Sequence, residues 1–207
     1  MRFSTALGGT RRENPPQRTT TDGISFLQMN FRGSETTWIL CQQELADRDL
    51  RPDVILVQDP PFLVCVGKNV FWGYRVFRPA SHGPCHALIL IRDCLRFRTA
   101  RPFGRRVVGI ELLGREGPVL ALFAYIRHTT GDGLEALDRA IRWAKSRSPR
   151  VIVGMDGNGH SPWWGPATTT TNPVGELIKN LILELDLEII NHPDCPPTFV
   201  SDMGHTT

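Results

Sequence analysis

The order of apolar and polar residues predicts a strand, a helix and a second strand early in the chain. Residues 24–30 form a short apolar run, residues 34–50 show the helical period, and residues 53–59 contain an unbroken apolar run. Ser34 stands at the N-cap position of the helix, whose apolar face is made by Trp38, Cys41 and Leu45. The run in the second strand is too short for a helix, so we expect that strand to be covered on both faces. The opening therefore predicts a β-α-β unit.

The middle of the chain predicts strands joined by turns. Runs rich in β-branched and aromatic residues recur between turn residues, over 70–78, 86–92, 95–98, 106–113 and 118–126. The last two runs are joined by the turn sequence Gly-Arg-Glu-Gly. Such a series implies antiparallel hairpins or a mixed sheet.

Two amphipathic helices are predicted in the second half. The first covers residues 132–147, with Asp132 and Glu135 as a capping pair. The second begins at Asn172 and has Pro173 in its first turn. Three further strands are expected around the second helix, over 150–155, 187–190 and 198–200.

These elements predict an α/β fold. Helices outside two strand series imply two packed mixed β-sheets flanked by helices, a four-layer α/β sandwich. Residues 1–22 are rich in Thr, Arg, Pro and Gly and show no apolar period. We therefore expect a flexible N-terminal segment over 1–22 and one domain over 23–207.

The composition is that of a globular protein. A chain of 207 residues can bury a sizeable core, and 41% hydrophobic with 22% charged residues exclude a disordered or collagen-like chain. No apolar run approaches the roughly 20 residues of a membrane helix, and the start lacks the apolar stretch of a signal peptide, so we expect an intracellular protein. Five cysteines without a Cys-x-x-Cys pair favour reduced thiols. His82 and Cys85 resemble half a zinc site, but no second half follows, so zinc is not expected.

Arginine carries most of the positive charge. The net charge is +3, and the only lysines are Lys68, Lys145 and Lys179. The planar guanidinium suits contact with phosphate, which is compatible with a nucleic-acid partner, whereas GC-rich coding would give the same bias without a function. A charge run is more often a solvated face than a binding site. The clearest cluster of basic residues contains one acidic residue, Asp93, and comprises Arg92, Arg96, Arg98, Arg101, Arg105 and Arg106.

Four predicted strands end in polar residues suited to phosphate chemistry, namely Asn30, Asp59, Tyr125 and the series Asp156, Asn158 and His160. Strand ends present functional side chains in layered α/β folds. Carboxylates with water and amide oxygens are the ligands of Mg²⁺, and phosphate-ester hydrolysis at such an ion needs an activated water and donors to the phosphate. Asp59 would hold the metal, and Asn30 and Asn158 would contact the phosphate. By alternation, the last three residues are expected on one side of an extended loop.

Each of these residues also has a structural interpretation. The sequence from Asp156 to Gly159 has the composition of a turn. Asp59 precedes two prolines and can simply end a strand, and Tyr125 can belong to the core. Trp163 and Trp164 fit packing anchors better than base-stacking platforms. Taken singly, none of these residues distinguishes the two interpretations.

In their order, the motifs resemble the endonuclease/exonuclease/phosphatase superfamily, and within it the apurinic-type endonuclease domain of non-LTR (LINE-type) retrotransposons. Members of that family run through a strand ending in Asn, a strand ending in Val-Gln-Glu, a strand containing Tyr, and a Gly-Asp-Phe-Asn-Ala-His loop before Trp-Gly. The corresponding stretches here are FLQMN, ILVQDPP, LFAYI and GMDGNGHSPWWG. The resemblance covers residues 24–207, and its last motif is most similar to arthropod elements that insert into ribosomal DNA.

The resemblance implies catalytic roles for Asn30, Tyr125, Asp156 and Asn158, and a metal-ligand position at Asp59 for Mg²⁺ or Mn²⁺. On the DNA side it implies His160, Arg127, Ser201, Asp202, His205 and Thr206. Asp59 stands where the family has Glu and is one methylene shorter, which predicts a lengthened or water-bridged contact with the metal. Met155 replaces the family's Gly and is expected to tighten the turn.

The resemblance also extends to the end of the chain. Family members continue past a Thr-Phe strand, matched here by Thr198 and Phe199, to a final Ser-Asp-His. We therefore expect a domain that is incomplete at its C-terminal end. Asp202 and His205 then correspond to a hairpin that reaches toward the DNA minor groove.

The function implied by the resemblance is a Mg²⁺-dependent endonuclease within a retrotransposon polyprotein. It would nick one strand of double-stranded target DNA, with ribosomal DNA as a candidate, and leave a 3′-hydroxyl for the reverse transcriptase domain of the same polyprotein. The site of action would be nuclear, with the protein otherwise cytoplasmic and without a membrane partner. Two alternatives stay open: a phosphoesterase of the same fold acting on small or lipid phosphates, and a DNA-binding module that is inactive as the 207-residue chain.

Overall fold

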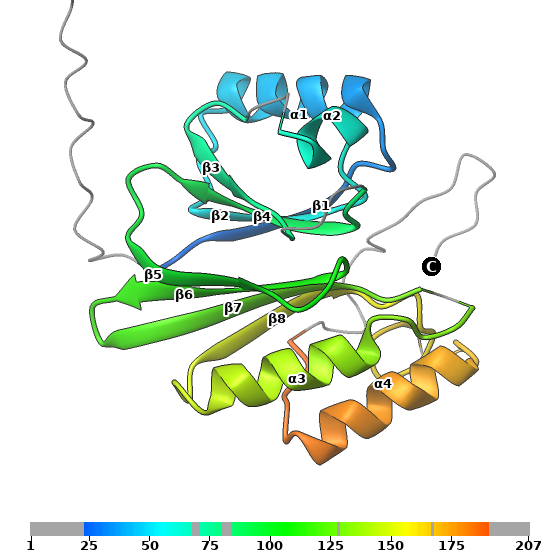
Figure 1. The fold of residues 1–207 in the computed structure, drawn as a ribbon. Helices are drawn as coiled ribbons and strands as arrows, with labels where there is room; N and C mark the ends of the chain where they lie inside the picture. Colours follow the sequence, from blue (N-terminus) through cyan, green and yellow to red (C-terminus); the bar gives the residue numbers. More distant parts are fainter. Residues whose placement is uncertain (1–22, 68–70, 80–83, 128, 167, 191–207) are drawn as a thin grey trace, which may run out of the picture.

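Two four-stranded mixed sheets pack face to face in the computed structural model (Figure 1), which describes residues 23–67, 71–79, 84–127, 129–166 and 168–190. The first sheet has, in spatial order, β1 (Phe26–Asn30), β2 (Val54–Gln58), β4 (Ala87–Arg92) and β3 (Tyr74–Phe77). The second sheet has β5 (Phe97–Pro102), β6 (Val107–Gly114), β7 (Gly117–Tyr125) and β8 (Val151–Asp156). Each sheet contains one parallel pair, β1 with β2 and β7 with β8.

Helices cover the outer face of each sheet, as Figure 1 shows. The first sheet is covered by α1 (Glu35–Asp47) and the short α2 (Phe62–Cys65), and the second by α3 (Leu134–Lys145) and α4 (Pro173–Glu184). The predicted four-layer α/β sandwich is confirmed. The predicted cap of α1 is also present, because the Ser34 hydroxyl accepts a hydrogen bond from the Thr37 N–H at 3.1 Å. None of the helices in the described part of the chain is a candidate membrane span.

The continuous apolar character of β2 follows from its position between two layers of core. Ile55 and Val57 pack toward α1, while Val54 and Leu56 pack between the sheets, and all four are buried. Gly154 on β8 allows the sheets to approach closely at this level. A Cβ atom at Gly154 would lie 2.3 Å from Leu56 Cδ1, so a larger residue would push the sheets apart.

Several boundaries differ from the predictions. Helix α3 begins at Leu134 after Gly133, which has a left-handed φ of 110° and gives no side-chain cap, so the predicted capping pair is wrong. Glu135 pairs with Arg139 one turn later instead. Helix α2 was not predicted, because a helix of 4 residues is too short to show a period.

The strand predicted over 187–190 is not formed. Leu187 and Ile189 pack against the core beneath the second sheet, so the alternation behind the prediction is present. The backbone has no paired strand there, and a ladder needs a neighbour as well as alternation. The predicted segment 1–22 and the predicted strand over 198–200 lie outside the described residues.

Candidate active site

Four strands, two from each sheet, end at one edge of the sandwich and bring the predicted polar residues together. In the first sheet, Asn30 at the end of β1 is in register with Gln58 at the end of β2, and Asp59 follows directly. In the second sheet, Tyr125 at the end of β7 is in register with Asp156 at the end of β8. Because each pair is parallel, both strands of a pair deliver their last residue to the same edge.

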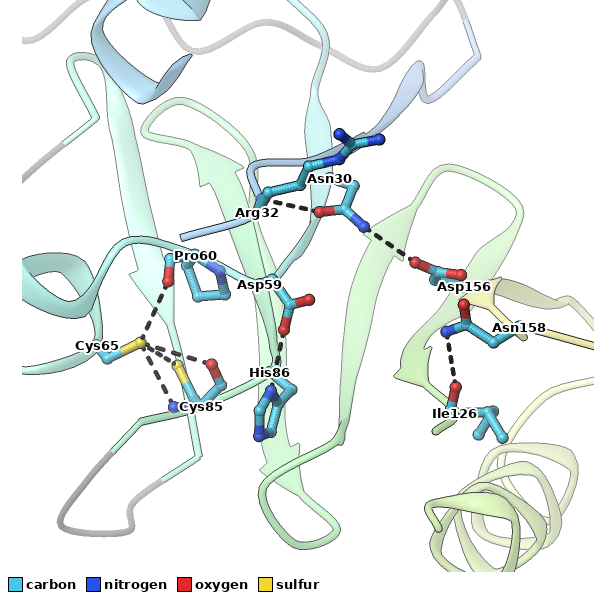
Figure 2. Close-up of polar contacts among 10 residues, drawn as sticks. All are labelled: Asn30, Arg32, Asp59, Pro60, Cys65, Cys85, His86, Ile126, Asp156 and Asn158. Carbon is cyan, nitrogen blue, oxygen red and sulfur yellow. Dashed lines mark hydrogen bonds and ion pairs between the residues drawn. The ribbon is translucent and has the colours of Figure 1, made fainter. Parts of the chain in front are cut away.

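A side-chain hydrogen bond joins the two sheets at this edge (Figure 2). Asn30 Nδ2 donates to Asp156 Oδ2 at 3.1 Å, and Asn30 Oδ1 accepts from the Arg32 N–H at 2.9 Å. The second bond orients the amide, so that its NH₂ group faces the carboxylate. Gln28 adds a second link between the sheets, from its Nε2 to the Met155 carbonyl at 3.2 Å.

Asp156 is a more basic carboxylate than an exposed one. Burial raises its pKa, and the nearby negative charge of Asp59 raises it further. The hydrogen bonds from the Asn30 side chain and the Asn158 backbone act in the opposite direction, but burial is the largest influence. The carboxylate is therefore held in one orientation and has a raised affinity for a proton.

Tyr125 lies among the same charges. Burial raises the pKa of its phenol, and Asp59 and Asp156 add to the rise, while Arg106 and Arg127 oppose it. The hydroxyl is therefore a hydrogen-bond donor at neutral pH. The Arg106 guanidinium lies 5.4 Å from the centre of the Tyr125 ring, and its buried Nη1 has no hydrogen-bond partner within the described residues. A guanidinium with one buried, unsatisfied nitrogen beside the phenol suits an anionic ligand.

The loop after β8 does not have the predicted extended conformation. Asn158 has a left-handed φ of 46°, which breaks the alternation of Asp156, Asn158 and His160. Asn158 Nδ2 donates to the Ile126 carbonyl at 2.9 Å, so its side chain turns back toward the second sheet. His160 is exposed. The loop therefore holds Asp156 and Asn158 near Tyr125, and His160 faces solvent.

The N-terminus of α4 holds this loop in place. Asn172 caps α4 by accepting from the Gly175 N–H at 2.7 Å, and the same oxygen accepts from the His160 N–H at 3.0 Å. Its Nδ2 donates to the Asn158 carbonyl at 3.4 Å. A Cβ atom at Gly175 would lie 2.1 Å from the His160 carbonyl oxygen, so glycine is required for this close approach. Asn172 was predicted as the start of this helix, but neither its capping bond nor its contacts with the loop were predicted.

Two tryptophans follow the loop. Trp164 packs against the core under the second sheet, and its Nε1 donates to the Gly159 carbonyl at 2.8 Å, which confirms the predicted packing role. Trp163 is 41% exposed and has Lys179 Nζ 5.3 Å from its ring centre. Of the two tryptophans, the half-buried Trp164 therefore acts as the anchor for the loop.

His86 is a neighbour of the site that the sequence did not indicate. Its Nδ1 lies 2.9 Å from Asp59 Oδ1 (Figure 2). The antiparallel register of Gln58 with Ala87 places Asp59 opposite His86, so the contact follows from strand pairing. Nothing in the local sequence around His86 carries that information.

Two buried cysteines lie behind Asp59. Cys65 Sγ and Cys85 Sγ are 3.0 Å apart, and the Cys65 thiol is 3.9 Å from the Pro60 carbonyl oxygen. The hydrogen bond from Cys85 lowers the pKa of Cys65 to about 6, and the same contact with burial raises that of Cys85. The four cysteines that the structure describes are free, as predicted. His82, which with Cys85 resembled half a zinc site in the sequence, lies outside the described residues.

Three arginines of the basic cluster between residues 92 and 106 make contacts within the fold. Arg92 lies 3.6 Å from the buried carboxylate of Asp53, and Arg98 lies 3.1 Å from that of Glu111. Arg101 lies over the ring of Phe103. Within this basic cluster, Arg106 is the member that reaches the polar cluster around Tyr125.

The residues predicted on the DNA side are placed in part. Arg127 is exposed and lies two residues after the end of β7, where its positive charge lowers the pKa of Tyr125. His160 is exposed on the loop after β8. The remaining candidates lie outside the described residues, namely Ser201, Asp202, His205 and Thr206.

The two carboxylates at this edge, Asp59 and Asp156, fit a divalent cation that keeps part of its water shell. Within the described residues there is no group of three His, Cys, Asp or Glu side chains that could enclose a metal ion. Asp59 and Asp156 are close enough for the charge of one to raise the pKa of the other, so a cation near both would relieve their repulsion. One or two carboxylates with several waters are the usual environment of Mg²⁺. This arrangement does not suit zinc, which prefers four enclosed nitrogen or sulfur ligands.

Part of the sequence matches a known family. Residues 119–207, less than half of the chain, match the profile of a family described as Endonuclease-reverse transcriptase. This segment includes Tyr125, Asp156 and Asn158. No protein with a curated description matches the sequence.

The fold is shared with solved structures. The endonuclease domain of TRAS1, a telomere-specific non-LTR retrotransposon, is 24% identical with a TM-score of 0.69, and the match covers 86% of this chain and 78% of that chain. The human Nocturnin catalytic domain with bound sulfate anion is 14% identical with a TM-score of 0.54, covering 78% of this chain and 70% of that one. D. rerio TDP2 complexed with single strand DNA product is 15% identical with a TM-score of 0.50, covering 81% and 66%. These likenesses establish a common α/β sandwich.

Proposed function

We propose that this chain is the endonuclease domain of a non-LTR retrotransposon polyprotein. It nicks one strand of double-stranded DNA and leaves a 3′-hydroxyl that primes reverse transcription. The observation that carries the proposal is the 3.1 Å contact between Asn30 and Asp156, which lie 126 positions apart and come from different sheets. The match of residues 119–207 to the Endonuclease-reverse transcriptase family and the fold shared with the TRAS1 endonuclease support it.

Asp156 is the residue best suited to accept a proton from the attacking water. Burial raises its pKa, and Asn30 holds the carboxylate in one orientation. The water oxygen forms a bond to phosphorus while the bond from phosphorus to the 3′-oxygen breaks. The 3′-oxygen takes up a proton from solvent water, and the products are a 3′-hydroxyl and a 5′-phosphate.

The other groups at the edge would bind the phosphate as negative charge builds up on it. Tyr125 presents a protonated hydroxyl, and Arg106 presents a cation whose buried Nη1 lacks a partner within the described residues. Asn158 has a second amide hydrogen beyond the one given to the Ile126 carbonyl. Together they offer neutral and positive donors to the phosphate oxygens.

Asp59 would hold Mg²⁺ or Mn²⁺, which would keep several waters, and the nearby charge of Asp156 also favours a cation at this position. When bound, the ion supplies Lewis-acid activation of the scissile phosphate. Asp59 has a short side chain, but its backbone is held by the hydrogen bond from the Gly33 N–H to its carbonyl at 2.7 Å. The chain therefore contributes a carboxylate whose position is set before the ion binds.

We further propose that the exposed side chains Arg127 and His160 contact the DNA backbone beside the site. The reverse transcriptase domain of the same polyprotein would be the partner that uses the new 3′-end, and the reaction would take place in the nucleus. Two target sequences are worth comparing. Ribosomal DNA is suggested by the resemblance of the last sequence motif, and telomeric DNA is chosen because TRAS1 is telomere-specific.

Nicking of supercoiled plasmid tests the proposal. Expressed within the longer polyprotein to which the proposal assigns it, the protein should convert supercoiled to open-circular DNA with Mg²⁺, and chelation by EDTA should stop the conversion. A DNA polymerase should extend the nick with labelled nucleotides, because a 3′-hydroxyl is present. Nicks that the polymerase cannot extend would contradict the proposed cleavage.

Two further measurements separate the alternatives. DNA binding that weakens with salt but is accompanied by no nicking would identify a DNA-binding module. Release of inorganic phosphate from inositol phosphates or phosphoinositide vesicles, without DNA binding, would identify a phosphoesterase of this fold. Either result would replace the endonuclease assignment.

A further inference from the structure

His86 contacts two of the residues assigned to the site. Its Nδ1 lies 2.9 Å from Asp59 Oδ1, and its ring stacks on the Tyr125 ring with centroids 5.4 Å apart and planes 18° apart. An ionised carboxylate is purely an acceptor, so Nδ1 carries the hydrogen in this contact. One side chain therefore connects Asp59 from the first sheet with Tyr125 from the second.

The position of the His86 ring is set by backbone hydrogen bonds to both sheets. The Asp59 N–H donates to the His86 carbonyl at 3.0 Å, which continues the pairing of β2 with β4. The His86 N–H donates to the carbonyl of Arg105, in the turn between β5 and β6, at 3.1 Å. The ring is thus mounted where the two sheets meet, and only about a third of it is exposed, 35%.

The Asp59 carboxylate needs such a support. Asp59 has a left-handed φ of 36° directly before Pro60, a backbone conformation that is unfavourable unless the surroundings enforce it. Its side chain is 30% exposed and could otherwise turn toward solvent. With Oδ1 bound to His86, the second oxygen points away from His86, on the side where Asp156 lies (Figure 2).

We infer that His86 is a positioning residue that presents one oxygen of Asp59 to a divalent cation and holds the Tyr125 ring beside it. The cation-binding part rests on the assignment of Asp59 as a metal ligand under the proposed function. Carboxylate ligands are commonly held by such a hydrogen bond, and its loss weakens metal affinity or activity by about 10- to 100-fold. The stacked ring adds a second constraint, which acts on Tyr125 rather than on Asp59.

Two substitutions separate the two contacts. His86→Phe keeps an aromatic ring against Tyr125 and removes the donor to Asp59. His86→Asn keeps an amide donor of similar reach and removes the ring. If His86 orients Asp59, Mn²⁺ affinity falls about 10- to 100-fold in His86→Phe and stays within about threefold of the parent in His86→Asn.

Mn²⁺ binding should be measured on the whole chain by electron paramagnetic resonance of the free ion, without DNA. Thermal unfolding of each variant shows whether it is folded at the temperature of the titration. His86→Ala, which loses both contacts, should bind no more tightly than His86→Phe. A purely structural histidine would instead lower unfolding temperatures without separating the Mn²⁺ affinities of the Phe and Asn variants.

The outcomes distinguish this inference from the proposed function. Equal Mn²⁺ affinity in the parent and His86→Phe, or no Mn²⁺ binding by the parent, would overturn the role of His86. The predicted difference in Mn²⁺ affinity together with no nicking of DNA would support the role of His86 and contradict the endonuclease assignment. With nicking present, the Mg²⁺ concentration for half-maximal rate should rise in His86→Phe by the same factor as the Mn²⁺ dissociation constant.

Discussion

Replacing Asn172 by alanine is expected to loosen the loop that carries Asp156 and Asn158. The Asn172 side chain accepts two hydrogen bonds, from the N–H groups of Gly175 and His160, and donates one to the Asn158 carbonyl. One side chain thus caps α4 and attaches the loop to it. Asn172→Ala removes all three contacts without adding bulk.

The cost follows from those contacts. Loss of an N-cap costs about 1 kcal/mol, and loss of the bond to the His160 N–H costs about 1 kcal/mol more. The free energy of unfolding should fall by about 2 kcal/mol, and the unfolding temperature by about 4–8 °C for a chain of this length. Because a displacement of about 1 Å at a reacting group can cost about 100-fold, the nicking rate should fall about 10- to 100-fold at temperatures where the variant is folded.

Two variants make the test specific. Asn172→Asp keeps an acceptor for both N–H groups, so it should restore stability to within about 0.5 kcal/mol and most of the activity. Ser148→Ala is the matched control, because Ser148 makes comparable bonds with Pro118 and Arg150 at the opposite end of β7 and β8. It should lose similar stability in a urea titration and keep its nicking rate. Equal nicking rates in Asn172→Ala and Ser148→Ala would refute the role given to the loop attachment.

Three other substitutions test the donor to Asp156, the phosphate contact and the packing of the loop against α4. Asn30→Ala should lower the nicking rate about 100- to 1000-fold, as loss of an oriented donor does in other hydrolases, and a rate within threefold of the parent would contradict its role. Arg106→Ala should reduce the slope of log DNA affinity against log salt concentration by about 1, whereas Arg106→Lys should keep the slope of the parent. An unchanged slope in the alanine variant would show that Arg106 does not contact the phosphate. Gly175→Ala should lower the free energy of unfolding, measured by urea titration, by about 1–3 kcal/mol, because its Cβ would lie 2.1 Å from the His160 carbonyl oxygen. A variant as stable as the parent would show that this close approach is wrong.

The layers of the fold could be predicted because they depend on the spacing of apolar residues within each short segment of the chain. The unbroken apolar run of β2 indicated a strand buried on both faces, and the run of strands from β4 to β7 followed from residue type and turns. The strand expected over 187–190 shows the limit of this reasoning. Alternation reports which side is buried, but a strand also requires a partner, and pairing is not visible in a single segment.

The candidate site could be predicted as a set of residues but not as a geometry. The ends of β1 and β8 were recognised from sequence, whereas the contact of Asn30 with Asp156 depends on how the two sheets pack. His86 was missed because its contact with Asp59 follows from strand register. The left-handed turn at Asn158 agrees with the turn composition of residues 156–159, but the sequence did not decide between a turn and an extended loop, because a glycine-rich segment permits both.

Plasmid nicking by Asp156→Asn is the decisive test of the active site assigned to this strand edge. The substitution keeps the size of the side chain and removes the carboxylate, which is the proposed proton acceptor and metal neighbour. Within the polyprotein, the parent protein is expected to nick DNA with Mg²⁺ and the variant to lose more than about 100-fold of that rate, with an unfolding temperature close to that of the parent. Nicking by Asp156→Asn at the rate of the parent would contradict the assignment of this strand edge as the active site.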